Sequence, residues 1–145
     1  MTGTLRAIAV APKKRAPMVE VEHATVTLAK GITGDARGHF PGRQVTIVFE
    51  DDWQAACTTL AQDLPWTTRR ANLLVSGIEV PRRIGAQLRV GEVLLEVREE
   101  TKPCGLMEKA VTGLKAALKP GWRGGVCCVV IEGGAIAAGD EVAVL

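Results

Sequence analysis

The strongest constraint on the fold is the way apolar residues alternate with polar ones in short runs. In the clearest run, Val93, Leu95 and Val97 fall on one face of an expected strand. Turns that draw on 16 glycines and 7 prolines separate such runs. Strands are expected at residues 5–11, 18–28 (as one or two strands), 44–49, 73–75, 84–90, 93–97, 126–131, 135–137 and 141–145. Many short strands predict a mainly β fold, a barrel or a strongly curved sheet, because closure removes exposed edges.

Two stretches instead repeat apolar residues at helical spacing, so we expect a few short helices beside the strands. The first follows the acidic residues 50–52, which are expected to cap it, and extends to Pro65. Its apolar face includes Cys57, for which we expect a core position. The second covers residues 107–118 as one helix and begins just after Cys104. The fold class expected is therefore a β-rich α+β domain.

Length and composition predict one globular domain over residues 1–145. The chain is 47% hydrophobic, which is enough for a real core, and its net charge is only +2. With no Tyr, three Trp and two Phe, it lacks the stacking residues that single-stranded nucleic-acid binders use. Neither nucleic acid nor a membrane is expected as a partner, because no charge cluster dominates and no apolar stretch is long enough to span a bilayer.

The four cysteines lie at positions 57, 104, 127 and 128, and none forms a C-x-x-C pair. With only two histidines, they do not give the ligand pattern of a structural zinc site. Neighbouring strand residues point to opposite faces, so Cys127 and Cys128 cannot share one environment, and a core role is expected for at least one. We expect reduced thiols in a cytoplasmic protein.

Cys104 is the candidate reactive residue because it ends a strand and directly precedes a helix. A helix N-terminus and a nearby cation, here Lys102, favour the thiolate, which is the form that attacks sulfur or binds metal. Pro103 fixes the backbone before the thiol, and Gly105 allows close approach of another molecule. The alternative is that Cys104 is a small buried hydrophobe, and the local sequence leaves both interpretations open.

Three basic segments are candidates for binding an anion. The longest loop, residues 30–43, holds four glycines with two arginines and a histidine, and glycine lets backbone N–H groups face a phosphate. The turn at residues 12–17 has three adjacent cations and is either a solvated loop or a contact for an anionic ligand. Arg69, Arg70 and Asn72 enter a buried strand, where the arginines could bind phosphate or pair with acidic side chains.

Four short motifs together resemble the MOSC domain, named after the C-terminal domain of molybdenum cofactor sulfurase. They are Gly-Ile-Thr-Gly-Asp at 31–35, Arg-Arg-Ala-Asn-Leu at 69–73, Lys-Pro-Cys at 102–104 and the glycine-rich segment 133–142. Their order and spacing extend over nearly the whole chain. The resemblance implies a single MOSC-like β-barrel that handles sulfur and molybdenum.

The resemblance also implies roles for particular residues. Cys104 matches the family's cysteine that is proposed to carry persulfide sulfur or to ligate molybdenum. Arg70 and Asn72 match an element that helps to hold the pterin phosphate and dithiolene of molybdenum cofactor (molybdopterin). Gly34 and Asp35 match the Gly-Asp loop. Further basic candidates for cofactor binding are Lys102, Arg37, Arg43 and Arg123.

Departures from larger members of the family leave three hypotheses. Residues 36–40 replace a histidine-rich sequence, and the chain has no iron–sulfur cysteine set and no pyridoxal phosphate domain or site of its own. The first hypothesis is a cofactor-binding protein, with two-electron reduction of N-oxygenated compounds if an electron-transfer partner supplies electrons. The second is a sulfur carrier that receives persulfide sulfur on Cys104 from a cysteine desulfurase. The third is a non-catalytic adaptor barrel, and the sequence does not decide whether the protein is an enzyme.

Overall fold

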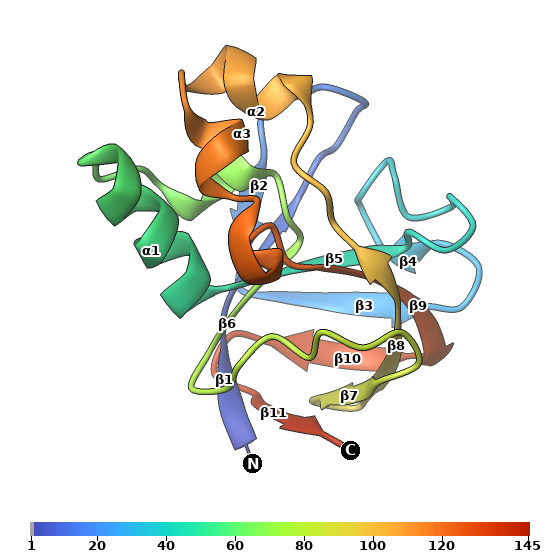
Figure 1. Cartoon of the computed structure of the whole chain (residues 1–145). Helices are drawn as coiled ribbons and strands as arrows, with labels where there is room; N and C mark the ends of the chain where they lie inside the picture. Colours follow the sequence, from blue (N-terminus) through green and yellow to red (C-terminus); the bar gives the residue numbers. More distant parts are fainter. Residues whose placement is uncertain (1) are drawn as a thin grey trace.

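The computed structural model describes residues 2–145, and its central feature is a closed β-barrel (Figure 1). Within these residues, the wall consists of seven strands: β1 (Thr2–Val10), β5 (Val45–Phe49), β6 (Leu73–Ser76), β7 (Gln87–Val90), β8 (Val93–Glu100), β9 (Val126–Glu132) and β11 (Glu141–Val144). Their order around the barrel is β11, β7, β8, β9, β5, β6, β1, and pairing of β1 with β11 closes it. Neighbouring strands are antiparallel except β5 and β6, which run parallel. The prediction of a mainly β barrel is confirmed.

The other strands extend the barrel or lie against it. The strand β2 (Val19–Val21) pairs with the end of β1. A separate small sheet is formed by β3 (His23–Thr27), which pairs with β10 (Gly134–Ala137) and with β4 (Gly31–Ile32). Residues 18–28 therefore form two strands that belong to different sheets.

The barrel interior is filled by the inward half of each alternating strand. In β5, Val45, Ile47 and Phe49 point inward and are almost fully buried, whereas Thr46 and Val48 face outward. Burial of each large side chain contributes roughly 1.5–3 kcal/mol of transfer free energy. The largest fully buried side chains of this interior are Leu5, Ile8, Ile32, Ile47, Phe49, Leu73, Leu88, Leu95 and Ile136.

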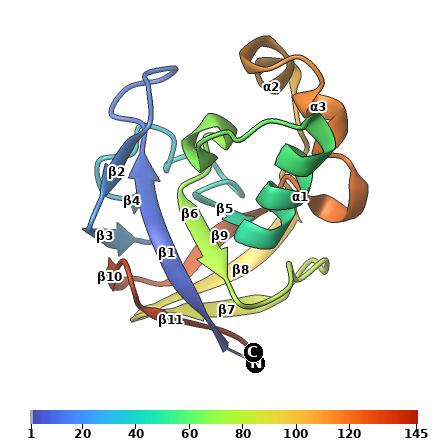
Figure 2. The same ribbon diagram turned by 90° about the vertical axis from the view of Figure 1, so that its left-hand side faces the viewer.

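A second apolar cluster lies between the outside of the barrel and three short helices, α1 (Glu50–Leu60), α2 (Gly105–Ala110) and α3 (Leu114–Ala117), among the residues described. Trp53 is buried here, and its Nε1–H donates to the Leu64 carbonyl at 3.0 Å. Single 3₁₀ turns, η1 (Trp66–Arg69) and η2 (Pro120–Trp122), complete the helical segments. Figures 1 and 2 place α2 and α3 at the end of the barrel opposite the two termini.

The first helix is shorter than the sequence pattern predicted. It ends at Leu60 because Ala61 adopts the left-handed conformation, with φ of 52°. The Ala61 N–H then bonds to the Thr58 carbonyl at 3.1 Å and the Gln62 N–H to the Cys57 carbonyl at 3.1 Å, which is the Schellman pattern of a helix end. Phe49, without a side-chain hydrogen bond, is the N-cap, so the acidic residues lie in the first turn, where the helix dipole favours them.

The single helix predicted for residues 107–118 is two helices. Gly113 has φ of 90°, which an α-helix cannot accommodate, and it separates α2 from α3. The Glu108 carboxylate accepts from the Gly113 N–H at 2.9 Å and from the Lys115 N–H at 3.4 Å, so it stabilises the start of α3. The prediction missed this break because the apolar spacing continues across it.

The strand predicted at residues 84–90 begins only at Gln87. Ile84 is 69% exposed, and Gly85 has φ of 90°, so a turn precedes the strand. Its partner β8 was predicted to start at Val93, as it does, but it extends to Glu100 instead of ending at Val97; Val90 lies opposite Val93. No helix between residues 2 and 145 combines the length and apolar character that crossing a bilayer requires.

Candidate functional site

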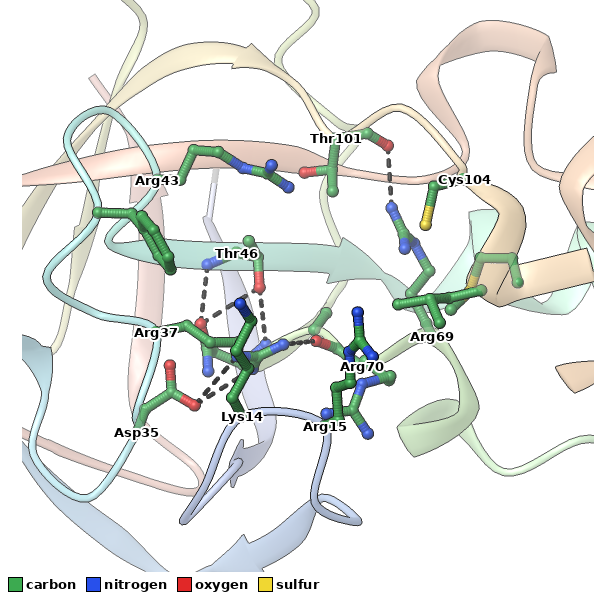
Figure 3. A pocket seen from close by; sticks show the side chains of 15 residues that line it. Lys14, Arg15, Asp35, Arg37, Arg43, Thr46, Arg69, Arg70, Thr101 and Cys104 are labelled. Carbon is green, nitrogen blue, oxygen red and sulfur yellow. Dashed lines mark hydrogen bonds and ion pairs between the residues drawn. The ribbon is translucent and has the colours of Figure 1, made fainter. Parts of the chain in front are cut away.

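A pocket of about 410 Å³ opens at the rim where β1 and β8 end and β5 and β6 begin (Figure 3). Segments far apart in the sequence form its wall, including both basic loops and the segment after β8. Its lining residues are Lys14, Arg15, Asp35, Arg37, Phe40, Arg43, Thr46, Arg69, Arg70, Ala71, Asn72, Thr101, Cys104, Leu106 and Met107. Six of the side chains in this lining are cationic and one is a carboxylate, so the pocket is strongly positive.

Thr46 and Asn72 join the two parallel strands at the base of the pocket. Asn72 is 2% exposed, and its Oδ1 accepts from the Thr46 N–H at 3.1 Å and from the Thr46 hydroxyl at 3.2 Å. Its Nδ2 donates to the Ala9 carbonyl at 3.2 Å, which ties β1 to the same point. Most of the hydrogen-bonding capacity of Asn72 therefore serves the barrel rim, although the residue lines the pocket as the sequence predicted.

Asp35 and Arg37 form a fixed unit that holds the long loop against the barrel. The Asp35 side chain is 1% exposed, and its Oδ1 accepts from the Ala11 N–H at 2.8 Å and from Arg37 Nη2 at 3.2 Å. Arg37 Nη1 donates to the Arg70 carbonyl at 3.0 Å. This pair therefore fixes the backbone of Arg70, whose left-handed φ of 63° directs the chain into β6.

Three cations of the lining remain available for a ligand. Within residues 2–145, the Lys14, Arg15 and Arg70 side chains form no ion pair or hydrogen bond with another residue. Burial lowers the pKa of the Arg70 guanidinium, and nearby Arg37 lowers it further, while Asp35 opposes this. By contrast, Arg43 pairs with Glu99 at 3.8 Å at the exposed rim. The basic turn is thus exposed, and two of its cations, Lys14 and Arg15, line the pocket.

Arg69 is the buried cation of the site. It is 6% exposed, its Nε donates to the Gly124 carbonyl at 3.0 Å, and its Nη2 donates to the Thr101 carbonyl at 2.9 Å. Burial lowers the pKa of Arg69, while the Cys104 and Cys127 thiols raise it. Arg69 therefore lies near Cys104, and it joins three backbone segments around the pocket.

Cys104 lies at the edge of the pocket, where β8 leads into α2. It is exposed and is the N-cap of α2, as the sequence predicted, although this helix is only six residues long. Thr101 anchors the preceding segment, since its N–H bonds to the Gly125 carbonyl at 2.9 Å and its Oγ1 lies 3.2 Å from Cys127 Sγ. The exposed thiol excludes the interpretation of Cys104 as a buried hydrophobe.

The other cysteines lie outside the pocket. Cys128 points into the barrel and Cys127 to the outer face of β9, and both are fully buried. Burial raises the pKa of the Cys128 thiol far above its usual range. Cys57 is half-buried and packs against the second cluster rather than within it, so its predicted core position is only partly correct.

The structure brings most of the predicted site residues together and leaves three apart. Cys104, Asp35, Arg37, Arg43, Arg70 and Asn72 line the pocket, whereas Gly34, Lys102 and Arg123 do not. Arg123 Nη1 instead donates to the Ala117 carbonyl at 3.1 Å. Thr46 and Thr101 also line the pocket and were not predicted from the sequence. Each had a signal that could have identified it: Thr46 is a polar residue in an apolar strand, and Thr101 directly precedes the Lys-Pro-Cys motif.

The donor set of the site does not suit a bare metal ion. Among residues 2–145, no group of three or more His, Cys, Asp or Glu side chains is arranged to hold one. The pocket instead places one soft sulfur donor, Cys104, beside several cations. Fold and site together define a small β-barrel domain with a cysteine at the edge of a basic pocket.

The family follows from comparison with known proteins. The MOSC domain matches this chain over residues 35–143, so the chain belongs to the MOSC domain family. No curated protein matches the chain.

Solved structures share the fold at low sequence identity. The YuaD protein from Bacillus subtilis is 19% identical, with a TM-score of 0.84 over 98% of this chain and 94% of that one. YiiM from Escherichia coli is 16% identical, with a TM-score of 0.75 over 100% of this chain and 70% of that one. YiiM from Geobacillus stearothermophilus is 14% identical, with a TM-score of 0.80 over 99% and 75%. At this identity, the likeness supports the fold alone.

Proposed function

We propose that this domain binds molybdenum cofactor, with the Cys104 thiolate as a ligand of the metal. The observation that carries the proposal is the exposed Cys104 on the same pocket as Lys14, Arg15 and Arg70, three cations without a protein partner among the residues described. These cations would hold the terminal phosphate of the pterin, since arginine presents paired N–H donors to phosphate oxygens. Membership of the MOSC family supports the same assignment.

The pocket fits such a ligand in size and in donor chemistry. Its volume of about 410 Å³ lies in the usual range of small-molecule sites, roughly 300–1,000 Å³. A metal that arrives with dithiolene sulfur ligands needs few donors from the protein, and a thiolate is a soft donor that matches them. Exposed Phe40 and Leu106 provide apolar surface in the lining for the rings of the pterin.

The residues of the chain have separate tasks in this proposal. Cys104 fixes the metal at the edge of the pocket, and Lys14, Arg15 and Arg70 fix the phosphate. Asp35 and Arg37 hold the Arg70 backbone in place. When bound, the cofactor would supply two-electron redox chemistry, such as reduction of an N-oxygenated compound, with electrons from a separate donor protein.

The test is metal analysis of protein made in a host that synthesises the cofactor. Wild type should carry close to one molybdenum atom per chain, and Cys104→Ser should carry none. Cys57→Ser is the matched control, because Cys57 lies outside the pocket, and its metal content should equal that of wild type. Wild type without molybdenum from such a host would refute the proposal.

Sulfur transfer is the second candidate, and the exposure of Cys104 favours it. A donor persulfide would pass its terminal sulfur to the Cys104 thiolate, so that a new S–S bond forms and the donor leaves as a thiolate. Incubation with a cysteine desulfurase and cysteine should then add the mass of one sulfur atom at Cys104. An unchanged intact mass under these conditions would eliminate this candidate.

A further inference from the structure

The Arg69 guanidinium carries a positive charge that no residue of the described chain balances. Its two hydrogen bonds go to the carbonyl oxygens of Gly124 at 3.0 Å and Thr101 at 2.9 Å, and carbonyls accept hydrogen bonds without carrying a full negative charge. No Asp or Glu between residues 2 and 145 lies within ion-pair distance of it. Asp35, the carboxylate in the pocket lining, is already paired with Arg37.

Besides joining these backbone segments, the Arg69 guanidinium is placed where it can bind an anion. Arg69 is only 6% exposed, and a buried charge without a counterion is costly. Its Nη1 forms no hydrogen bond, yet no side-chain N or O atom within residues 2–145 is both buried and unpartnered, so Nη1 opens into the pocket. Figure 3 shows the sulfur of Cys104 directed toward this guanidinium.

We propose that Arg69 binds an anionic group, a carboxylate or another oxyanion, of the molecule that reacts at Cys104. The substrate class is therefore small anionic compounds, and neutral compounds of the same shape are disfavoured. This inference rests on the sulfur-transfer candidate, the proposed function in which the Cys104 sulfur itself reacts. It assigns to Arg69 a task distinct from that of Lys14, Arg15 and Arg70, which hold the phosphate of the cofactor.

Two alkylating reagents that differ only in charge test the inference on metal-free protein. Iodoacetate carries a carboxylate and iodoacetamide a neutral amide, and in both cases the thiolate forms an S–C bond while iodide leaves. The rate of each reaction at Cys104 is followed by peptide mass analysis of full-length protein from a host without the cofactor. Because both reagents need the same thiolate, the ratio of the two rates does not depend on how much thiolate is present.

The expected ratio of iodoacetate to iodoacetamide rates at Cys104 is about tenfold above the ratio for free glutathione, since a charge-assisted contact is worth roughly one such factor. Arg69→Gln should return the ratio to the glutathione value, whereas Arg69→Lys should retain part of the preference. Arg70→Gln is the matched control, because it removes the same charge from the same pocket without touching the guanidinium beside Cys104. It should keep more than half of the preference.

Three results would overturn the inference. A wild-type ratio equal to that of glutathione would show no recognition of the anion. Equal losses in Arg69→Gln and Arg70→Gln would assign the preference to the general field of the pocket. If Arg69→Gln does not fold, the salt dependence of the rate ratio in wild type is measured instead. Salt screens a buried contact only weakly, so loss of the iodoacetate preference at about 0.5 M salt would also overturn the inference. Failure of molybdenum binding would leave these rates unaffected, so the two proposals fail separately.

Discussion

Replacement of Asn72 by alanine tests whether this residue supports the barrel rim or serves the ligand. The variant removes three hydrogen bonds, two with Thr46 at 3.1 and 3.2 Å and one with the Ala9 carbonyl at 3.2 Å. Loss of one buried partner costs roughly 1–3 kcal/mol, and water in the adjacent pocket can replace part of the loss. The free energy of unfolding should therefore fall by about 2–4 kcal/mol.

Urea denaturation measures this difference. With a slope of roughly 2 kcal/mol per molar urea, the midpoint should fall by about 1–2 M without a change of slope. Arg70→Ala is the control from the same pocket, and its unfolding free energy should stay within about 0.5 kcal/mol of wild type, because its side chain has no protein partner among residues 2–145. A loss below about 1 kcal/mol for Asn72→Ala would refute the structural role of Asn72.

Three further predictions follow from the backbone, the buried thiol and the basic turn. Gly125→Ala should lower the melting temperature far more than Gly34→Ala. Both glycines have a positive φ, 93° and 94°, but the new Cβ at Gly125 lies 2.9 Å from a carbonyl carbon, whereas the Cβ at Gly34 has nothing within 4 Å. Equal shifts in melting temperature would contradict this. Burial raises the pKa of Cys128, so the unfolded thiol loses its proton first and stability should fall above about pH 9, by at most ~1.4 kcal/mol per pH unit. Cys128→Val should reduce that fall in urea titrations, and an unchanged pH profile would refute the assignment. Lys14→Gln should weaken pyrophosphate binding about tenfold in calorimetry. Lys13→Gln is the control, because Lys13 does not line the pocket, and it should leave the affinity unchanged. Equal effects of the two substitutions would contradict a specific contact with Lys14.

Local patterns predicted the barrel better than they predicted its helices. The alternation in residues 93–97 identified β8 and its hairpin because strand period and turn chemistry both depend on neighbouring residues. The break at Gly113 depends instead on the Glu108 carboxylate reaching two backbone N–H groups, which apolar spacing does not reveal. The early end of α1 has a similar origin, because Ala61 carries no sequence signal for a left-handed residue.

The pocket lining was predictable where a residue belongs to a recognisable local motif, and unpredictable where its position depends on the topology of the barrel. Cys104 stood out because a strand, a proline and a helix start meet there. Arg69 and Arg70 are adjacent in sequence, yet Arg69 is buried with bonds to two distant carbonyls while Arg70, in a left-handed conformation, has no side-chain partner among the residues described. Lys14 reaches the pocket because β1 and β6 are neighbours in the barrel, which its own segment does not encode.

The number of strands in the barrel has a consequence for where a pocket can form. Among the residues described, seven strands close the ring, and an odd ring cannot alternate in direction all the way round. At least one pair must run parallel, here β5 and β6, and a parallel pair needs a crossover from one end of the barrel to the other. That crossover is the segment from α1 to η1, and it returns to the rim beside the start of β5. Because the ring has an odd number of strands, this crossover is required, and it places Arg69 and Arg70 at the rim of the barrel beside the pocket.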